Sequence, residues 1–253
     1  YSHEKAHALD KGSEERSICK EGKLSLGYGV GHDKYGGRVF ELTGENVDIR
    51  CKCPVDPENP KYKKHTCEAK RIVNIYRESC PRVVQYWYDM EAAVFRAMKE
   101  PGTVQEAGVF KFIKKGIFLH LRLPNGRVLR YPGAEIRQML KFGKMAPTFI
   151  YYGERSGKKS DEENRDTNFS KNWRIKEMYG AKFFQNACQA IARDIMAEAM
   201  LRVQRHKVDA EEIYKIVLTV HDEIVGIFRN DGPGDIKEVE ELMIIVPDWC
   251  KGL

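Results

Sequence analysis

The sequence lacks the features that mark membrane, secreted and repeat proteins. No apolar run reaches the length that spans a bilayer, and no signal peptide opens the chain. The 7 cysteines are an odd number at irregular spacings, unlike the framework of a disulfide-rich secreted domain. No internal repeats or low-complexity runs stand out. We therefore expect a soluble protein with reduced thiols in the cytoplasm and no membrane partner.

What the chain does contain is typical of a globular protein. Its 253 residues are 42% hydrophobic and 32% charged, which suits one large domain or two closely packed ones. The net charge of +6 leans towards a polyanionic partner, although so small an excess is weak evidence by itself. Neither Tyr1 nor Leu253 resembles a natural terminus, so we expect a fragment.

The stretch KIVLTVHDEIVGIF, from Lys215 to Phe228, predicts a β-hairpin. Two runs rich in β-branched residues flank the polar triplet His221-Asp222-Glu223, which we predict to be the tight turn. On such a tip the two carboxylates would lie away from the core, where an aspartate can bind a metal ion. The competing interpretation is an ordinary hairpin whose turn is polar because turns are.

A helix is predicted between Ser13 and Gly31, with Ser13 as its N-cap and glycines at its end. Four residues follow one another at four-residue steps along one face: Arg16, Lys20, Leu24 and Tyr28. Cations suit the phosphates of a nucleoside triphosphate, and an apolar or flat side chain suits its sugar and base. The alternative for the two cations is a solvated basic stripe.

These residues resemble known sequence motifs. The pattern R-xxx-K-xxx-L-xxx-Y-G, from Arg16 to Gly29, resembles motif B, the fingers helix of family A (DNA polymerase I-like) DNA polymerases, and His221-Asp222-Glu223 resembles their motif C. Three segments between these motifs are similar to the bacteriophage branch of that family: Glu68–Ala93, Leu121–Pro132 and Tyr179–Met200. The motifs also occur in the family's order, and the resemblance spans nearly the whole chain.

The resemblance implies template-directed DNA synthesis, in which a primer 3′-hydroxyl attacks the α-phosphate of a dNTP with the help of two Mg²⁺ ions. The catalytic residues it implies are Asp222, a Mg²⁺ ligand, with Glu223 supporting the site and Lys20 acting on the triphosphate. The nucleotide-binding residues it implies are Arg16, Lys20, Leu24, Tyr28 and Gly29. His221 would contact the primer end. The expected partners are primer-template DNA and dNTP, in a bacterial host cytoplasm.

A long helix is predicted from Tyr179 to Arg205, because apolar residues recur along one face. Gln185, Gln189 and Arg193 lie beside that face, where amides suit the acceptors of a DNA minor groove; glutamines on a helix are otherwise usually its solvated side. By resemblance Gln189 is the primer-contacting glutamine, and either Gln185 or Asn186 is its companion. We expect Asp194 to be structural.

Two departures from the family pattern carry predictions. Leu24 replaces an aromatic residue, so it offers no hydroxyl to the sugar, and we expect strong discrimination against dideoxynucleotides. Motif A, with the second metal-binding aspartate, is not found in this chain, nor is there room for an exonuclease domain. We therefore expect the isolated chain to be inactive, with motif A cut off or carried by a separate chain. The alternatives are a non-catalytic DNA- or nucleotide-binding part of a split polymerase, and a metal-dependent nuclease.

A cysteine-containing insertion is expected at residues 38–67. Its soft ligands are Cys51, Cys53, His65 and Cys67, the number that a tetrahedral Zn²⁺ requires. The CxC and HxC spacing is unusual for zinc, and free thiols are the alternative.

The expected architecture is α+β, an incomplete right-hand polymerase. We expect mostly helical fingers over residues 1–150, a polar connection over 151–178, and a palm over 179–253. Pro81 should break a helix running from Glu68 to Lys99, and Asn125-Gly126 should turn a hairpin. The arginines on or beside that hairpin, Arg122, Arg127 and Arg130, could contact phosphates or simply be exposed on strands.

Overall fold

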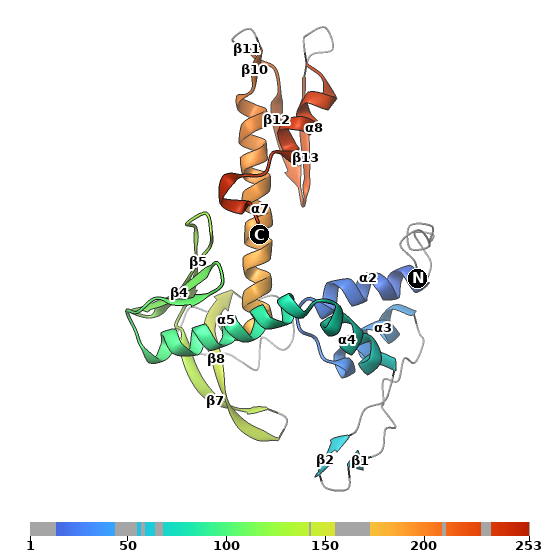
Figure 1. Ribbon diagram of the computed structural model, residues 1–253, viewed down its shortest axis with the longest axis vertical. Helices are drawn as coiled ribbons and strands as arrows, with labels where there is room; N and C mark the ends of the chain where they lie inside the picture. The colour runs from blue at the N-terminus through green and yellow to red at the C-terminus, as the bar shows by residue number, and fades with distance from the viewer. Residues whose placement is uncertain are drawn as a thin grey trace.

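The computed structural model describes residues 14–43, 55–56, 59–63, 68–141, 143–154, 173–208, 211–228 and 234–252. Helices and antiparallel sheets both contribute, so the α+β prediction is confirmed. One long helix, α7 (Gly180–Arg205), runs through the molecule, and three groups of elements are arranged around it (Figure 1). Near its N-terminal end α7 packs against α5 (Pro81–Lys99) (Figure 1).

The first group contains the helices α2 (Glu14–Leu26), α3 (His32–Thr43) and α4 (Glu68–Ser79). They enclose a small core of their own, which consists of Leu26, Val30, Tyr35, Val39, Ala69 and Val73. Two short strands, β1 (Val55–Asp56) and β2 (Asn59–Lys63), lie between α3 and α4 in sequence. Pro81 stands at the first position of α5, directly after Cys80, so the predicted helix break is confirmed.

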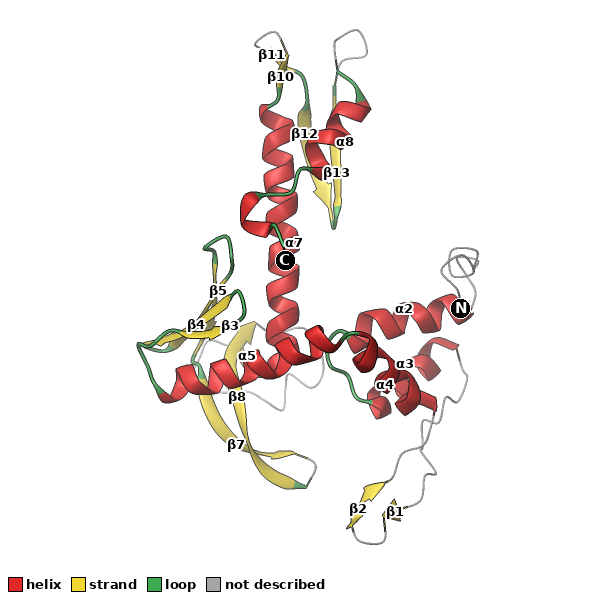
Figure 2. Ribbon diagram, viewed as in Figure 1, coloured by secondary structure: helices red, strands yellow, loops and turns green. Residues whose placement is uncertain are grey.

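The second group is a pair of antiparallel sheets (Figure 2). One sheet has the order β3 (Gln105–Ala107), β4 (Phe110–Lys115), β5 (Phe118–Arg122) and β6 (Val128–Pro132). The other has the order β7 (Glu135–Lys141), β8 (Lys144–Glu154) and β9 (Trp173–Met178). The hairpin predicted at Asn125-Gly126 is confirmed between β5 and β6.

The prediction of mostly helical structure up to about residue 150 was wrong beyond Lys99. The physical reason is an alternating pattern: in β4, Phe110 and Phe112 are buried while Lys111 is exposed, which is the period of a strand. The predicted polar connection is also partly strand, since β8 extends to Glu154 and pairs with β9.

The main core forms where these sheets meet α5 and the first half of α7. Phe183 of α7 is its centre, with ring centroids 5.8 Å from Phe112, 5.0 Å from Tyr131 and 5.2 Å from Phe149, all in edge-to-face contact. Met90, also fully buried, extends the core onto α5. The core therefore fixes the start of α7 against both sheets.

The third group follows α7. It contains the short strands β10 (Lys207–Val208) and β11 (Glu211–Glu212), the hairpin β12 (Lys215–Val220) and β13 (Glu223–Ile227), the helix α8 (Ile236–Ile244) and the turn η1 (Asp248–Cys250). Arg202 of α7 donates to the carbonyls of Leu242 and Ile245 at 3.0 and 2.8 Å, which holds α8 to α7. The same group leaves much apolar surface uncovered, on Val217, Leu218, Val220, Val225, Ile227, Phe228, Ile236, Met243, Ile244, Ile245 and Val246.

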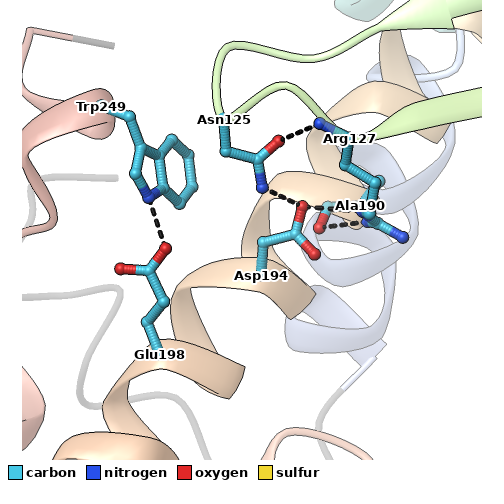
Figure 3. A network of polar contacts seen from close by, with 6 residues as sticks. All are labelled: Asn125, Arg127, Ala190, Asp194, Glu198 and Trp249. Carbon is cyan, nitrogen blue, oxygen red and sulfur yellow. Dashed lines mark hydrogen bonds and ion pairs between the residues drawn. The ribbon is translucent and has the colours of Figure 1, made fainter.

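A polar junction fastens the β5–β6 hairpin to the middle of α7 (Figure 3). Asp194 accepts hydrogen bonds from the Asn125 amide at 2.7 Å and from Arg127 Nε at 2.8 Å, and Arg127 also donates to the carbonyl of Ala190 at 2.8 Å. The Asp194 side chain is only 15% exposed. One turn further along α7, Glu198 accepts from the Trp249 indole at 2.5 Å. The expected structural role of Asp194 is confirmed, and Arg127 forms a structural ion pair.

Replacing Asp194 with alanine should lower the free energy of unfolding by about 2 kcal/mol, because a guanidinium and an amide would lose their shared charged acceptor. Urea unfolding monitored by tryptophan fluorescence measures this difference. The matched control is Asp248→Ala, which removes a carboxylate that is 93% exposed, and its effect should stay below about 0.5 kcal/mol. Equal losses in the two variants would contradict the structural role of Asp194.

Candidate functional site

The polar turn lies at the free end of the β12–β13 hairpin. Val220 pairs with Glu223, so the turn itself contains two residues, His221 and Asp222, and Glu223 begins β13. The predicted hairpin is confirmed, but its turn is one residue shorter than predicted. His221 has φ of 53°, a conformation in which two-residue hairpin turns match the twist of the flanking strands. All three polar side chains are exposed, so both carboxylates can be reached from solvent.

The other end of the hairpin is held by contacts with α7 and α8. Gln204 of α7 accepts a hydrogen bond at 2.9 Å from the backbone amide of Ile216 in β12. Tyr214, buried just before β12, donates to Glu238 of α8, and His206 lies 2.8 Å from the same carboxylate. The pKa of Glu238 is held below its usual value by the Tyr214 hydrogen bond and then by His206. The hairpin is therefore anchored at its base and open at its tip.

The predicted nucleotide-binding stripe lies mainly on α2. Arg16, Lys20 and Leu24 are exposed on this helix, with Leu24 at 54%. Tyr28 is not in the helix, which ends two residues earlier at Leu26, so the fourth member of the stripe follows the helix in a turn. Ser13, the predicted N-cap, lies outside the described residues.

Tyr28 is the point at which the two predicted site regions meet. Its hydroxyl accepts a hydrogen bond at 3.2 Å from the Gln189 amide, 161 positions further along the chain on α7. Its backbone carbonyl accepts one at 3.0 Å from the hydroxyl of Tyr179. The structure thus brings the expected nucleotide residue Tyr28 into contact with the expected primer residue Gln189.

Two glycines allow α5, α7 and the turn that follows α2 to approach one another closely at this point. Gly29 has φ of +68°, and a Cβ added there would lie 2.8 Å from the Cβ of Ala181. A Cβ at Gly180 would overlap the carbonyl of Trp87 in α5. Gly29, which the resemblance names as a nucleotide-binding residue, thus lies with its backbone close to α7.

The two candidates for the companion of Gln189 differ in their surroundings. Asn186 donates to the Tyr131 hydroxyl at 3.3 Å, so its amide faces the main core. Burial raises the pKa of Tyr131 and keeps that hydroxyl neutral. The Gln185 side chain is half-buried, and its Oε1 is buried without a hydrogen-bond partner among the described residues. Of the two candidates, Gln185 therefore has a side-chain oxygen that accepts no hydrogen bond from the described residues.

The hairpin tip and α2 lie on the same side of α7. In Figure 1 the turn between β12 and β13 points away from the loops at the top of the molecule and towards the level of α2. A surface hollow of about 530 Å³ lies elsewhere, between α5 and β7, and contains none of the predicted site residues. In this view the acidic turn and α2 therefore lie on one side of α7.

The acidic turn has the donor type that Mg²⁺ prefers, since Asp222 and Glu223 offer carboxylate oxygens and no competing thiolate. Over the part of the chain that the structure describes, no group of three or more His, Cys, Asp or Glu side chains could hold a metal ion. The candidate zinc ligands Cys51, Cys53, His65 and Cys67 all lie outside the described residues. Within the described ranges no helix is both long and apolar enough to cross a membrane.

Sequence reasoning missed Tyr179 as a site residue. It precedes the amphipathic part of the predicted helix, and it carries no periodic signal that separates it from a core aromatic residue. Its importance arises from a contact 151 positions away, with the carbonyl of Tyr28. Only the folded arrangement of α2 and α7 reveals that contact.

Comparison with curated proteins found similarity to a DNA polymerase of Bacillus phage SP02. That protein is 30% identical to this chain over 247 residues, which is 97% of the chain. The chain spans 32% of the length of this relative. No protein-family description matches the chain, and no solved structure matches it at a significant level. The similarity covers both the α2 stripe and the acidic turn, and it supports a relationship with DNA polymerases.

Proposed function

We propose that this chain is the nucleotide-binding part of a family A DNA polymerase of the bacteriophage branch. It would comprise the fingers and most of the palm. The observation that carries the proposal is the similarity to a phage DNA polymerase over 97% of the chain. The motifs described above supply the residue roles, and the common side of α7 on which the hairpin tip and α2 lie supports their cooperation.

The incoming dNTP would bind along α2. Arg16 and Lys20 are exposed one helical turn apart, so both can reach neighbouring phosphates of one triphosphate. The Arg16 guanidinium suits two phosphate oxygens at once, and the Lys20 ammonium offers a compact positive charge. Charge that develops on the departing pyrophosphate would be stabilised by these cations. Leu24 would face the sugar, and Tyr28 would hold the template-side base position.

Asp222 would hold Mg²⁺, with Glu223 beside it on the first residue of β13. Bound Mg²⁺ would lower the pKa of the primer hydroxyl and stabilise negative charge on the attacking and departing oxygens. The anchored base of the hairpin would keep Asp222 at a fixed height, while the exposed tip leaves room for the primer end. His221, in the same turn, would contact the primer end.

The duplex would lie against α7. Gln189 is exposed and would donate to minor-groove acceptors, which occur at equivalent places in every base pair. Gln185, one turn earlier on α7, would make a second contact of this kind. Such amides register the shape of a base pair without requiring a particular sequence.

A second candidate function, gripping DNA or nucleotide without catalysis, is favoured by one observation. Across the described ranges the carboxylates do not gather into a group that could hold a metal ion by themselves. In this second function the chain would only bind, and a further chain segment that carries motif A would be needed to complete the catalytic metal site.

Asp222→Ala in the complete polymerase should reduce primer extension by at least about 1,000-fold, because loss of a metal ligand removes several kcal/mol of transition-state stabilisation. Extension of a labelled primer by single-turnover kinetics measures this. The control is Asp248→Ala, whose carboxylate is exposed on η1. A variant at Asp222 that kept a tenth or more of the wild-type rate would remove this residue from the mechanism.

The 253-residue chain alone should not extend a primer in the presence of Mg²⁺ and dNTPs, because the second metal-binding aspartate is expected elsewhere. Denaturing gel analysis of a labelled primer-template measures extension, and the complete polymerase is the positive control. Robust Mg²⁺-dependent synthesis by the chain alone would show that it contains a complete metal site. Nicking of plasmid DNA without nucleotides would instead indicate a nuclease.

Leu24→Tyr should lower the discrimination against dideoxynucleotides by at least about tenfold, because the new hydroxyl can replace the missing sugar hydroxyl as a hydrogen-bonding group. The matched control is Leu24→Phe, which adds the ring without the hydroxyl and should keep strong discrimination. The measurement is the ratio of incorporation efficiencies for deoxy and dideoxy forms. Nearly equal incorporation by the wild-type polymerase would show that Leu24 does not discriminate.

A further inference from the structure

Tyr179 lies immediately before α7 and reaches across to the end of α2. Its hydroxyl donates to the backbone carbonyl of Tyr28 at 3.0 Å. The same tyrosine stands at the N-cap position of α7 in extended conformation, and its side chain does not cap that helix. Its hydroxyl is therefore directed to another element and does not serve the helix that it precedes.

The ring of Tyr179 is held in place from its own side of the junction. Lys182 Nζ lies 5.1 Å from the ring centroid, and the same ammonium donates to the carbonyl of Glu177 at 3.1 Å. Burial raises the pKa of the Tyr179 hydroxyl, and the Arg38 charge acts in the opposite direction. The hydroxyl accordingly remains protonated and able to donate at neutral pH.

The residue that Tyr179 holds is located where α2 gives way to a turn. The helix ends at Leu26, whose carbonyl accepts from the amide of Gly29 at 2.9 Å. Gly29 then takes a left-handed conformation, with φ of +68°. Tyr28 thus lies between a helix end and a left-handed glycine, and small changes of backbone angle there would swing its ring.

Two hydrogen bonds fix Tyr28 at opposite ends. Gln189 binds its hydroxyl and Tyr179 binds its carbonyl, and both partners belong to α7 or its first preceding residue. The side chain and the backbone of Tyr28 are therefore both positioned by residues of α7 or next to it. The position of the Tyr28 ring is therefore set by α7 as well as by α2.

We propose that Tyr179 is a positioning residue for nucleotide selection: it fixes the backbone of Tyr28 so that the Tyr28 ring is aligned with the DNA-facing side of α7. This inference rests on the proposed function, because it assigns Tyr28 to the incoming base pair. Tyr179 itself touches neither nucleotide nor metal in this role. Its effect passes through Tyr28.

The test is Tyr179→Phe in the complete polymerase, which removes one hydroxyl and keeps the ring beside Lys182. The KM for the correct dNTP should rise by about 3- to 10-fold, the size expected for one lost neutral hydrogen bond, while kcat changes less than twofold. Discrimination against a mismatched dNTP should fall. Tyr88→Phe is the matched control, since this tyrosine is 64% exposed on α5, and it should behave as wild type.

A structural readout separates positioning from a general loss of stability. The thermal midpoint of Tyr179→Phe should agree with that of the control, while hydrogen–deuterium exchange should increase in a peptide covering residues 24–31. Unchanged exchange in that peptide, or a KM equal to that of the control, would overturn the proposal. A fall in thermal midpoint with kcat and KM changed together would overturn it as well, because the residue would then be merely structural.

The same experiment distinguishes the inference from the proposed function. If the wild-type polymerase fails to extend a primer, the proposed function is wrong and the selection role falls with it, whatever the exchange data show. If the wild-type enzyme is active and Tyr179→Phe matches the control, the proposed function stands and this inference alone is wrong.

Discussion

The close contact of α5, α7 and the turn that follows α2 is the constraint on which the rest of the structure depends. It requires a residue without a side chain at Gly180, where the carbonyl of Trp87 occupies the space of a Cβ, and again at Gly29 against Ala181. Because interiors are close-packed, neither helix can move aside to accept even a methyl group without disturbing the main core. The end of α2 is consequently placed relative to α7 within narrow limits.

The long helix α7 therefore has two structural roles. Its first half is buried against the sheets through Phe183, while its last turns hold the hairpin base and α8 through Gln204 and Arg202. The elements proposed to bind nucleotide and metal are thus both tied to one rigid helix. A rigid helix transmits position over its whole length, which is how groups from distant parts of a sequence can be held in one arrangement.

Local signals in the sequence predicted several elements correctly. Pro81 broke the helix, Asn125-Gly126 turned a hairpin, and the β-branched runs around His221 formed strands, because each depends on neighbouring residues alone. Apart from that Asn125-Gly126 hairpin, the sheets after Lys99 were not predicted, because the expectation of helical fingers outweighed an alternating pattern in the sequence.

Contacts between residues that lie far apart in the sequence could not be predicted from the sequence. The structural role of Asp194 was expected, yet its partners Asn125 and Arg127 lie 69 and 67 positions away and could not be named beforehand. The Tyr28–Gln189 contact could not be predicted for the same reason, since these residues lie 161 positions apart. The individual roles in catalysis and DNA binding, and the fingers and palm assignment, stay predictions.

The uncovered apolar surface of the third group has a practical consequence. The β12–β13 hairpin is a sheet of two strands, and no third strand among the described residues pairs with it. On the β12 side the amide of Ile216 is bound by Gln204 of α7, whereas Val225 and Ile227 are exposed on β13. Open strand edges beside apolar side chains are templates for intermolecular pairing. In a preparation of this chain by itself, molecules would recruit one another through this hairpin, and the extent of self-association would grow with protein concentration.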